Sequence, residues 1–128
     1  MIASLIHQKN PAKAAKIFTE LGALQVPMAY FNAGMLTGAV GNYTEAANLV
    51  LEEMKRTTLD PSELSKSHVL YQDLVAKVDD IEGKNAAKKL IRRAKKVDAD
   101  YADELSTKLL DGLLVPPTPM GSAVNDEL

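Results

Sequence analysis

Residues 29–61 read AYFNAGMLTGAVGNYTEAANLVLEEMKRTTLDP, and this stretch decides the fold. Its apolar residues recur at steps of three and four, which is the period of one face of an α-helix. Gly41 and Asn42 interrupt this pattern once, and Asp60 with Pro61 ends it. The stretch therefore predicts two helices, and because the turn between them is short we expect them to pack antiparallel.

The same period continues on both sides of this stretch. It predicts helices over residues 11–21, 28–39, 43–54, 62–80, 86–97 and 99–114, and a short helix around His7 before them. Strand alternation and hairpin turns between apolar runs are absent, so the fold class is all-α with about seven helices. Asn10 is expected to cap the helix that begins at Pro11, and Gly22 to follow its last turn. The predicted core stripes include Val69, Leu74, Leu90, Leu110 and Leu113.

Three segments of the chain resemble one another. Each places an Ala-Ala pair one turn inside a helix, at residues 14–15, 46–47 and 86–87. The pairs are 32 and 40 residues apart, and the first spacing is near the period of about 34 residues that helix-turn-helix repeats have. The longer helix over 62–80 accounts for the second spacing. The pattern indicates repeated helical hairpins that bury their apolar faces against one another.

The segment 27–61 resembles the tetratricopeptide repeat (TPR) family. The matching residues are an aromatic and a glycine on the first helix, a Gly-Asn-Tyr-Thr-Glu-Ala turn and a closing proline: Tyr30, Gly34, Gly41, Tyr43, Ala46 and Pro61. Gly34 and Ala46 are expected to let the two helices approach closely, while Tyr30 and Tyr43 fill the wedge between units. The segment departs from the family pattern at three positions: Ala33, Thr37 and Glu53.

The resemblance implies a short right-handed solenoid over residues 1–114. Its final helix, over 99–114, is expected to cap the open end, because solenoids require a terminal cap. Residues 115–128 contain three prolines and terminal acids, which predicts an extended or disordered tail. The first unit has only ten residues before Pro11. Two explanations stay open: a clipped first repeat, or a chain that is part of a longer one.

The resemblance also implies a function without chemistry of its own. Repeat proteins of this family are scaffolds that hold a partner segment in a groove lined by the first helix of each unit. By this analogy the partner groove is lined by Tyr30, Asn32, Thr37, His68, Gln72 and Asp73. Asn32 matches an asparagine that clamps a partner's terminal carboxylate in some members. His68 and Gln72 stand where such a clamp has basic residues, so this particular ligand is not expected.

A cationic segment over residues 84–96 is the sharpest charge feature. It contains no acid, and its cations are Lys84, Lys88, Lys89, Arg92, Arg93, Lys95 and Lys96. The rest of the chain keeps 8 of the 15 Lys and Arg residues against all 17 acids, a net charge of −9 there. On a helix the cations form a basic face. Two ligands suit such a face: the phosphates of a nucleic acid, or an acidic protein. A solvated face balanced by neighbouring acids is the third possibility.

Composition excludes several other classes of protein. With no Cys and only 2 His, neither a disulfide scaffold nor a structural zinc site can be assembled. No catalytic triad and no phosphate loop in the right context is present, so we expect no enzyme and no cofactor. No apolar run approaches the roughly 20 residues of a membrane span, and no signal peptide is recognised. The predicted setting is cytoplasmic, with a protein partner and self-association as an open possibility.

Overall fold

A computed structural model describes residues 10–56 and 60–114, and these residues form helices and no strands. The helices are α2 (Pro11–Ala23), α3 (Ala29–Ala39), α4 (Tyr43–Met54), α5 (Pro61–Glu82), α6 (Lys84–Lys95) and α7 (Ala99–Leu110). The all-α prediction is therefore confirmed for this part of the chain. The predicted helix around His7 and the predicted Pro-rich tail over 115–128 lie outside the described residues.

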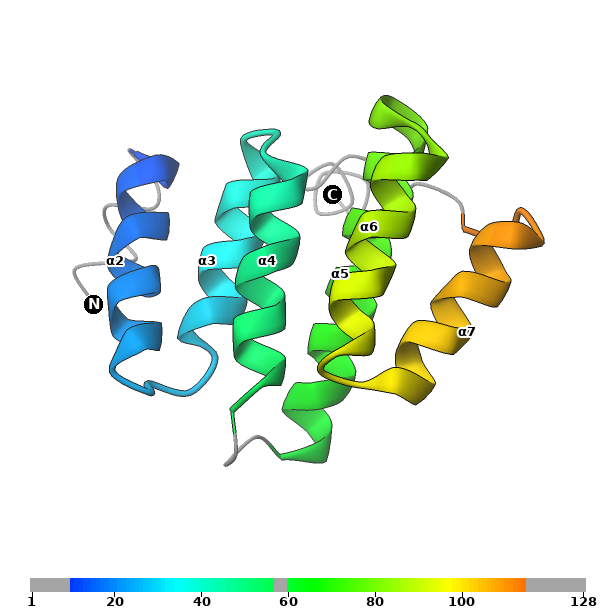
Figure 1. Cartoon of the computed structure of the whole chain (residues 1–128). Coiled ribbons are helices and arrows are strands. Elements are labelled where there is room, and N and C mark those ends of the chain that lie inside the picture. The colour runs from blue at the N-terminus through cyan, green and yellow to red at the C-terminus, as the bar shows by residue number, and fades with distance from the viewer. Residues whose placement is uncertain (1–9, 57–59, 115–128) are drawn as a thin grey trace, which may run out of the picture.

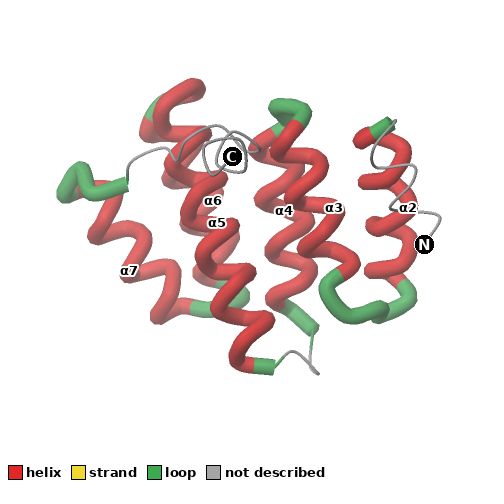
Figure 2. The backbone as a smooth tube through the Cα atoms, turned by 180° about the vertical axis from the view of Figure 1, so that it is seen from behind, coloured by secondary structure: helices red, strands yellow, loops and turns green. Residues whose placement is uncertain are grey.

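The helices stand in a row and the chain turns back at each connection (Figure 1). Each helix packs chiefly against the next one along the chain. Some contacts also skip a neighbour: α3 touches α5, and α4 touches α6. Figures 1 and 2 show the resulting two layers from opposite sides, with α4 and α6 in one layer and α3 and α5 in the other.

Local capping starts three of the helices. Asn10, Asp60 and Asp98 each accept, through a side-chain oxygen, a hydrogen bond from the backbone N–H three residues further on, at 3.1, 2.9 and 3.2 Å. Pro11 and Pro61 occupy the first turn, where the missing N–H costs nothing. These residues fix where α2, α5 and α7 begin, and the predicted cap at Asn10 is confirmed.

The close approach predicted between α3 and α4 is present. A Cβ atom added to Gly34 would lie 2.8 Å from Val50 Cγ2 and 3.1 Å from the Ala46 carbonyl oxygen. Both distances are shorter than ordinary van der Waals contact, so any side chain at this position would force Val50 or the α4 backbone to shift. The hairpin therefore depends on the absence of a side chain.

The main core runs from α4 to α7. Leu74 and Leu90, both predicted to be buried, lie inside it, together with Leu105. Tyr71 is fully buried and its hydroxyl donates a hydrogen bond of 2.5 Å to the Leu90 carbonyl. Because the hydroxyl has this partner, the ring can fill the space between α5 and α6 without an unpaired polar atom.

Several sequence predictions need correction. Val69, Leu110 and Leu113 were assigned to the core stripes, yet each is at least 60% exposed. The last helix ends at Leu110 rather than at residue 114, so Leu110 is its final residue and Leu113 follows it. Gly22 lies within α2 rather than after it. A Cβ atom added to Gly22 would lie 2.6 Å from the Tyr30 ring.

Glu53, one of the departures from the family pattern, is fully buried and caps α3. Its carboxylate accepts hydrogen bonds from the Phe31 backbone N–H at 3.3 Å and from Arg56 Nη1 at 2.7 Å. Arg56 also approaches the Gln25 carbonyl oxygen, at 3.5 Å. Met28, the residue before α3, provides no side-chain cap. The Glu53 carboxylate of α4 instead accepts the hydrogen bond from the first turn of α3, and this contact fixes the start of α3 relative to α4.

Candidate functional site

A groove lies between α3 and α5, on the layer formed by the first helix of each hairpin. It has a volume of about 340 Å³ and is lined by Phe31, Met35, Ser65, Lys66, Val69, Leu70 and Asp73. Phe31 and Met35 are one turn apart on α3, as are Val69 and Asp73 on α5, so each pair projects from one side of its helix. We call this surface the α3–α5 groove.

The α3–α5 groove combines exposed apolar side chains with one carboxylate, Asp73, and one exposed cation, Lys66. Met35 is 43% exposed and Val69 is 60% exposed, although both are large hydrophobic residues. Burial raises the pKa of the Asp73 carboxyl above its ordinary value. The Asp73 side chain forms no hydrogen bond or ion pair with another described residue. A partially desolvated carboxylate of this kind favours a cation beside it.

The predicted groove residues of α3 lie elsewhere. Tyr30 covers Gly22 of α2, so its ring fills the junction between those two helices. Thr37 is buried and lines a hollow between α2 and α4, on the other side of α3. Asn32 is half-buried, and its side chain forms no hydrogen bond within the part of the chain that the structure describes. None of the three lines the α3–α5 groove.

Two of the predicted residues of α5 hold α7 in place. The His68 ring stacks on Tyr101 with centroids 3.9 Å apart, and its Nε2 lies 3.2 Å from an Asp98 carboxylate oxygen. The Tyr101 hydroxyl donates a hydrogen bond to the His68 carbonyl. Gln72 accepts a hydrogen bond of 3.2 Å from Lys108 of α7. Asp73 is thus the one member of the predicted set that lines the α3–α5 groove.

Sequence reasoning missed the apolar residues of this groove. Phe31, Met35 and Val69 follow helical spacing, so they were indistinguishable from core residues in the sequence. A signal existed on α5, where Ser65, Lys66, Val69 and Asp73 share one side of the helix. A stripe that mixes polar and apolar side chains in this way is typical of a surface rather than a core.

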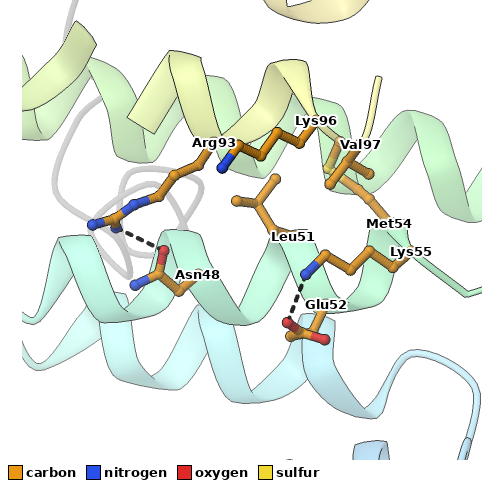
Figure 3. A pocket seen from close by; sticks show the side chains of 8 residues that line it. All are labelled: Asn48, Leu51, Glu52, Met54, Lys55, Arg93, Lys96 and Val97. Atoms are coloured by element: carbon orange, nitrogen blue, oxygen red, sulfur yellow. Dashed lines mark hydrogen bonds and ion pairs between the residues drawn. The ribbon is translucent and has the colours of Figure 1, made fainter. Parts of the chain in front are cut away.

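The basic face predicted over residues 84–96 coincides with α6, and all seven of its cations are exposed. Within the described ranges none of them forms an ion pair with an acid. Arg93 Nη1 donates a hydrogen bond of 2.9 Å to the Asn48 side-chain oxygen of α4. This contact turns the Arg93 side chain across the space between α6 and α4 (Figure 3).

A second groove lies between α4 and α6, and we call it the α4–α6 groove. Its volume is about 580 Å³, and Figure 3 shows its lining: Asn48, Leu51, Glu52, Met54, Lys55, Arg93, Lys96 and Val97. A smaller hollow of about 300 Å³ adjoins it and is lined by four cations, Lys89, Arg92, Arg93 and Lys96. Arg93 and Lys96 belong to both hollows.

Two general properties of the described residues complete the description. No three His, Asp or Glu side chains there gather closely enough to hold a metal ion. None of the described helices has the length and apolar character of a membrane span.

Comparison with family models, with curated proteins and with solved structures gives no match to this chain. The resemblance to the TPR family therefore rests on the residues quoted from the sequence, and it stays a prediction.

Proposed function

We propose that this chain is a non-enzymatic protein-interaction module, built as a short TPR-like right-handed solenoid, that holds a segment of a protein partner in the α3–α5 groove. The order of contacts supports the solenoid, because α3 touches α5 and α4 touches α6 while every helix packs on its neighbour. In such an array the first helices of successive hairpins lie side by side and offer one continuous surface. The α3–α5 groove lies on that surface.

The single observation that carries the proposal is the combination of exposed apolar residues with a carboxylate that has no hydrogen-bond or ion-pair partner among the described residues. Phe31, Met35 and Val69 offer a site for one apolar side chain, whose burial supplies binding free energy. Asp73, at the same groove, favours a lysine or arginine close to that anchor. The proposed ligand is therefore a peptide segment in which an apolar residue lies next to a basic one.

A second candidate function is a subunit that binds nucleic acid, and the seven exposed cations of α6 favour it. Such a protein loses affinity steeply as salt rises, because binding releases counterions from the phosphates. The net charge of −9 outside residues 84–96 opposes a polyanion, and the lining of the α4–α6 groove offers no aromatic ring on which bases stack. We therefore prefer protein interaction to nucleic-acid binding as the function of this chain.

The test is a selection from a displayed random peptide library against the purified chain, followed by affinity measurement on two variants. Val69→Lys replaces an apolar side chain of the α3–α5 groove by a cation that repels a basic ligand, whereas Ile81→Lys makes the same change at an equally exposed site on the same helix. We expect the selected peptides to carry an apolar residue beside a Lys or Arg.

Their affinity should fall at least about tenfold, or about 1.4 kcal/mol, for Val69→Lys and stay unchanged for Ile81→Lys. Circular dichroism checks that both variants keep their helix content. Equal loss in the two variants, or selected peptides without this pattern, contradicts the proposed site.

A further inference from the structure

The cations of α6 are not spread evenly over its surface. Four of them, Lys89, Arg92, Arg93 and Lys96, line one hollow of about 300 Å³. Placing like charges around one hollow costs electrostatic free energy unless an anion lies among them. No acid of the described residues forms an ion pair with any of the four. The hollow thus has the charge of an anion site and no anion from the described chain.

The role of these cations in helix stability is limited. Arg92 and Arg93 lie in the last turn of α6, where positive charge interacts favourably with the helix dipole. Lys96 is the C-cap residue directly after α6, where positive charge is favoured in the same way, whereas Lys89 lies before the last turn. The dipole therefore accounts for part of the charge of α6 and not for its convergence on one hollow.

The neighbouring α4–α6 groove adds a small apolar floor to this charge. That floor is made by the half-buried Val97 and by the outer edges of two core residues, Leu51 (5% exposed) and Met54 (7% exposed). Arg93 and Lys96 connect this groove to the cationic hollow. Figure 3 shows the two cationic side chains above Leu51, with the Arg93 guanidinium turned toward Asn48. Apolar side chains of a ligand and its acidic groups would therefore be bound within one contiguous surface.

We propose that the α4–α6 groove and its cationic hollow bind an acidic amphipathic segment of a protein partner, with apolar side chains against Leu51, Met54 and Val97 and carboxylates against Arg93 and Lys96. This surface lies on the layer opposite the α3–α5 groove. The proposal is independent of the one made for that groove, which takes a basic segment.

Charge complementarity and the groove lining favour an acidic protein segment over a nucleic acid. A phosphate backbone offers no apolar side chain for Leu51, Met54 and Val97, whereas an amphipathic peptide does. Glu52 also lines the groove and lies 3.0 Å from Lys55, so the rim carries both signs of charge. A continuous polyanion cannot avoid Glu52, whereas a segment with few carboxylates can place them against Arg93 and Lys96 alone.

The experiment uses synthetic peptides and two double variants of the full chain. The probe is an amphipathic peptide of about 16 residues, long enough for about four helical turns, with Leu on one face and Glu on the other. One control peptide replaces Glu by Gln, and a second replaces Leu by Ser and keeps the charge. A single-stranded DNA of matched charge is the fourth ligand.

The first double variant is Arg93→Glu with Lys96→Glu, which reverses two charges that line both hollows. The matched control is Lys88→Glu with Lys95→Glu, which makes the same charge change on α6 at exposed positions that line neither hollow. Calorimetry or fluorescence anisotropy measures affinity at roughly 50 and 200 mM salt, the range over which phosphate contacts weaken steeply.

We expect the Leu/Glu peptide to bind best of the four ligands. The Arg93/Lys96 variant should weaken it at least about tenfold, and the Lys88/Lys95 variant by less than about threefold, since exposed charges at a distance are screened. The basic peptide of the α3–α5 groove should bind both variants like the parent, which separates this proposal from the first. The proposal is overturned if the Gln peptide binds equally well, if both double variants lose affinity equally, or if the DNA binds more tightly than the peptide.

Discussion

The hairpin of α3 and α4 and the hairpin of α5 and α6 have the same antiparallel arrangement but pack in different ways. In the first, the helices have 11 and 12 residues and meet at Gly34, where the Ala46 carbonyl oxygen lies 3.1 Å from the place of a Cβ atom. In the second, the 22-residue α5 places the fully buried Tyr71 against α6. One hairpin lacks a side chain at its contact, and the other has one of the largest.

This difference predicts opposite sensitivities. The α3/α4 contact has no free volume, so it is sensitive to any added atom. The α5/α6 contact is filled by one aromatic ring, so it is sensitive to the loss of atoms. The two kinds of substitution therefore test the two hairpins separately, although both hairpins belong to one array.

The largest effect is expected for Tyr71→Ala, which leaves a cavity between α5 and α6. The free energy of unfolding should fall by about 3–5 kcal/mol, the usual loss for a buried aromatic residue. Tyr71→Phe keeps the ring and removes only the hydrogen bond to the Leu90 carbonyl, so it should cost about 1 kcal/mol. Urea unfolding followed by circular dichroism measures both. Equal losses for the two variants would show that the ring does not fill the contact.

A smaller loss is expected for Gly34→Ala, about 1–3 kcal/mol, because the new methyl group would overlap Val50 and the Ala46 carbonyl. The sign is informative, since alanine in an unconstrained helix stabilises relative to glycine. The same urea measurement applies. In the background of Val50→Ala, which removes the nearer contact, Gly34→Ala should cost less. A stabilised single variant would contradict the close approach.

The smallest effect concerns Asp73, which lies where the two hairpins meet. Burial raises the pKa of its carboxyl above the ordinary value of 3.8, so the folded state holds this proton more tightly than the unfolded chain does. The carboxylate therefore destabilises the fold at neutral pH, and this cost vanishes as pH falls below 3.8. Asp73→Asn should raise the melting midpoint slightly at pH 7 and leave it unchanged below pH 3.8. The same variant should bind the basic peptides selected for the α3–α5 groove more weakly. A variant that is less stable at pH 7 would contradict the assignment.

The starts of the helices and the close contact in the first hairpin could be predicted from the sequence because they depend on local chemistry. A cap such as Asn10 acts on the next three residues, and a glycine such as Gly34 allows close packing with the neighbouring helix. Leu74 and Leu90 were also predicted to be buried, since any packing of their helices covers the centre of the apolar stripe.

The lining of the grooves could not be predicted because it depends on how the helices rotate against more than one neighbour. Helix α5 contacts α3, α4 and α6, and its residues His68 and Gln72 contact α7. With so many neighbours, the apolar spacing does not say which side of α5 stays open, and Val69 was placed in the core. Glu53 was recognised only as a departure from a pattern, because its role depends on an amide 22 residues away.

The central claim is that a partner segment binds between α3 and α5, and a titration followed by nuclear magnetic resonance tests it most directly. The ¹⁵N-labelled full chain would be titrated with the tightest basic peptide from the library selection, and the shifts of the assigned backbone amides recorded. The account predicts that the largest shifts cluster at Phe31, Met35, Val69 and Asp73 and are absent in Val69→Lys. Shifts that cluster on α6 instead, or that persist unchanged in Val69→Lys, would contradict it.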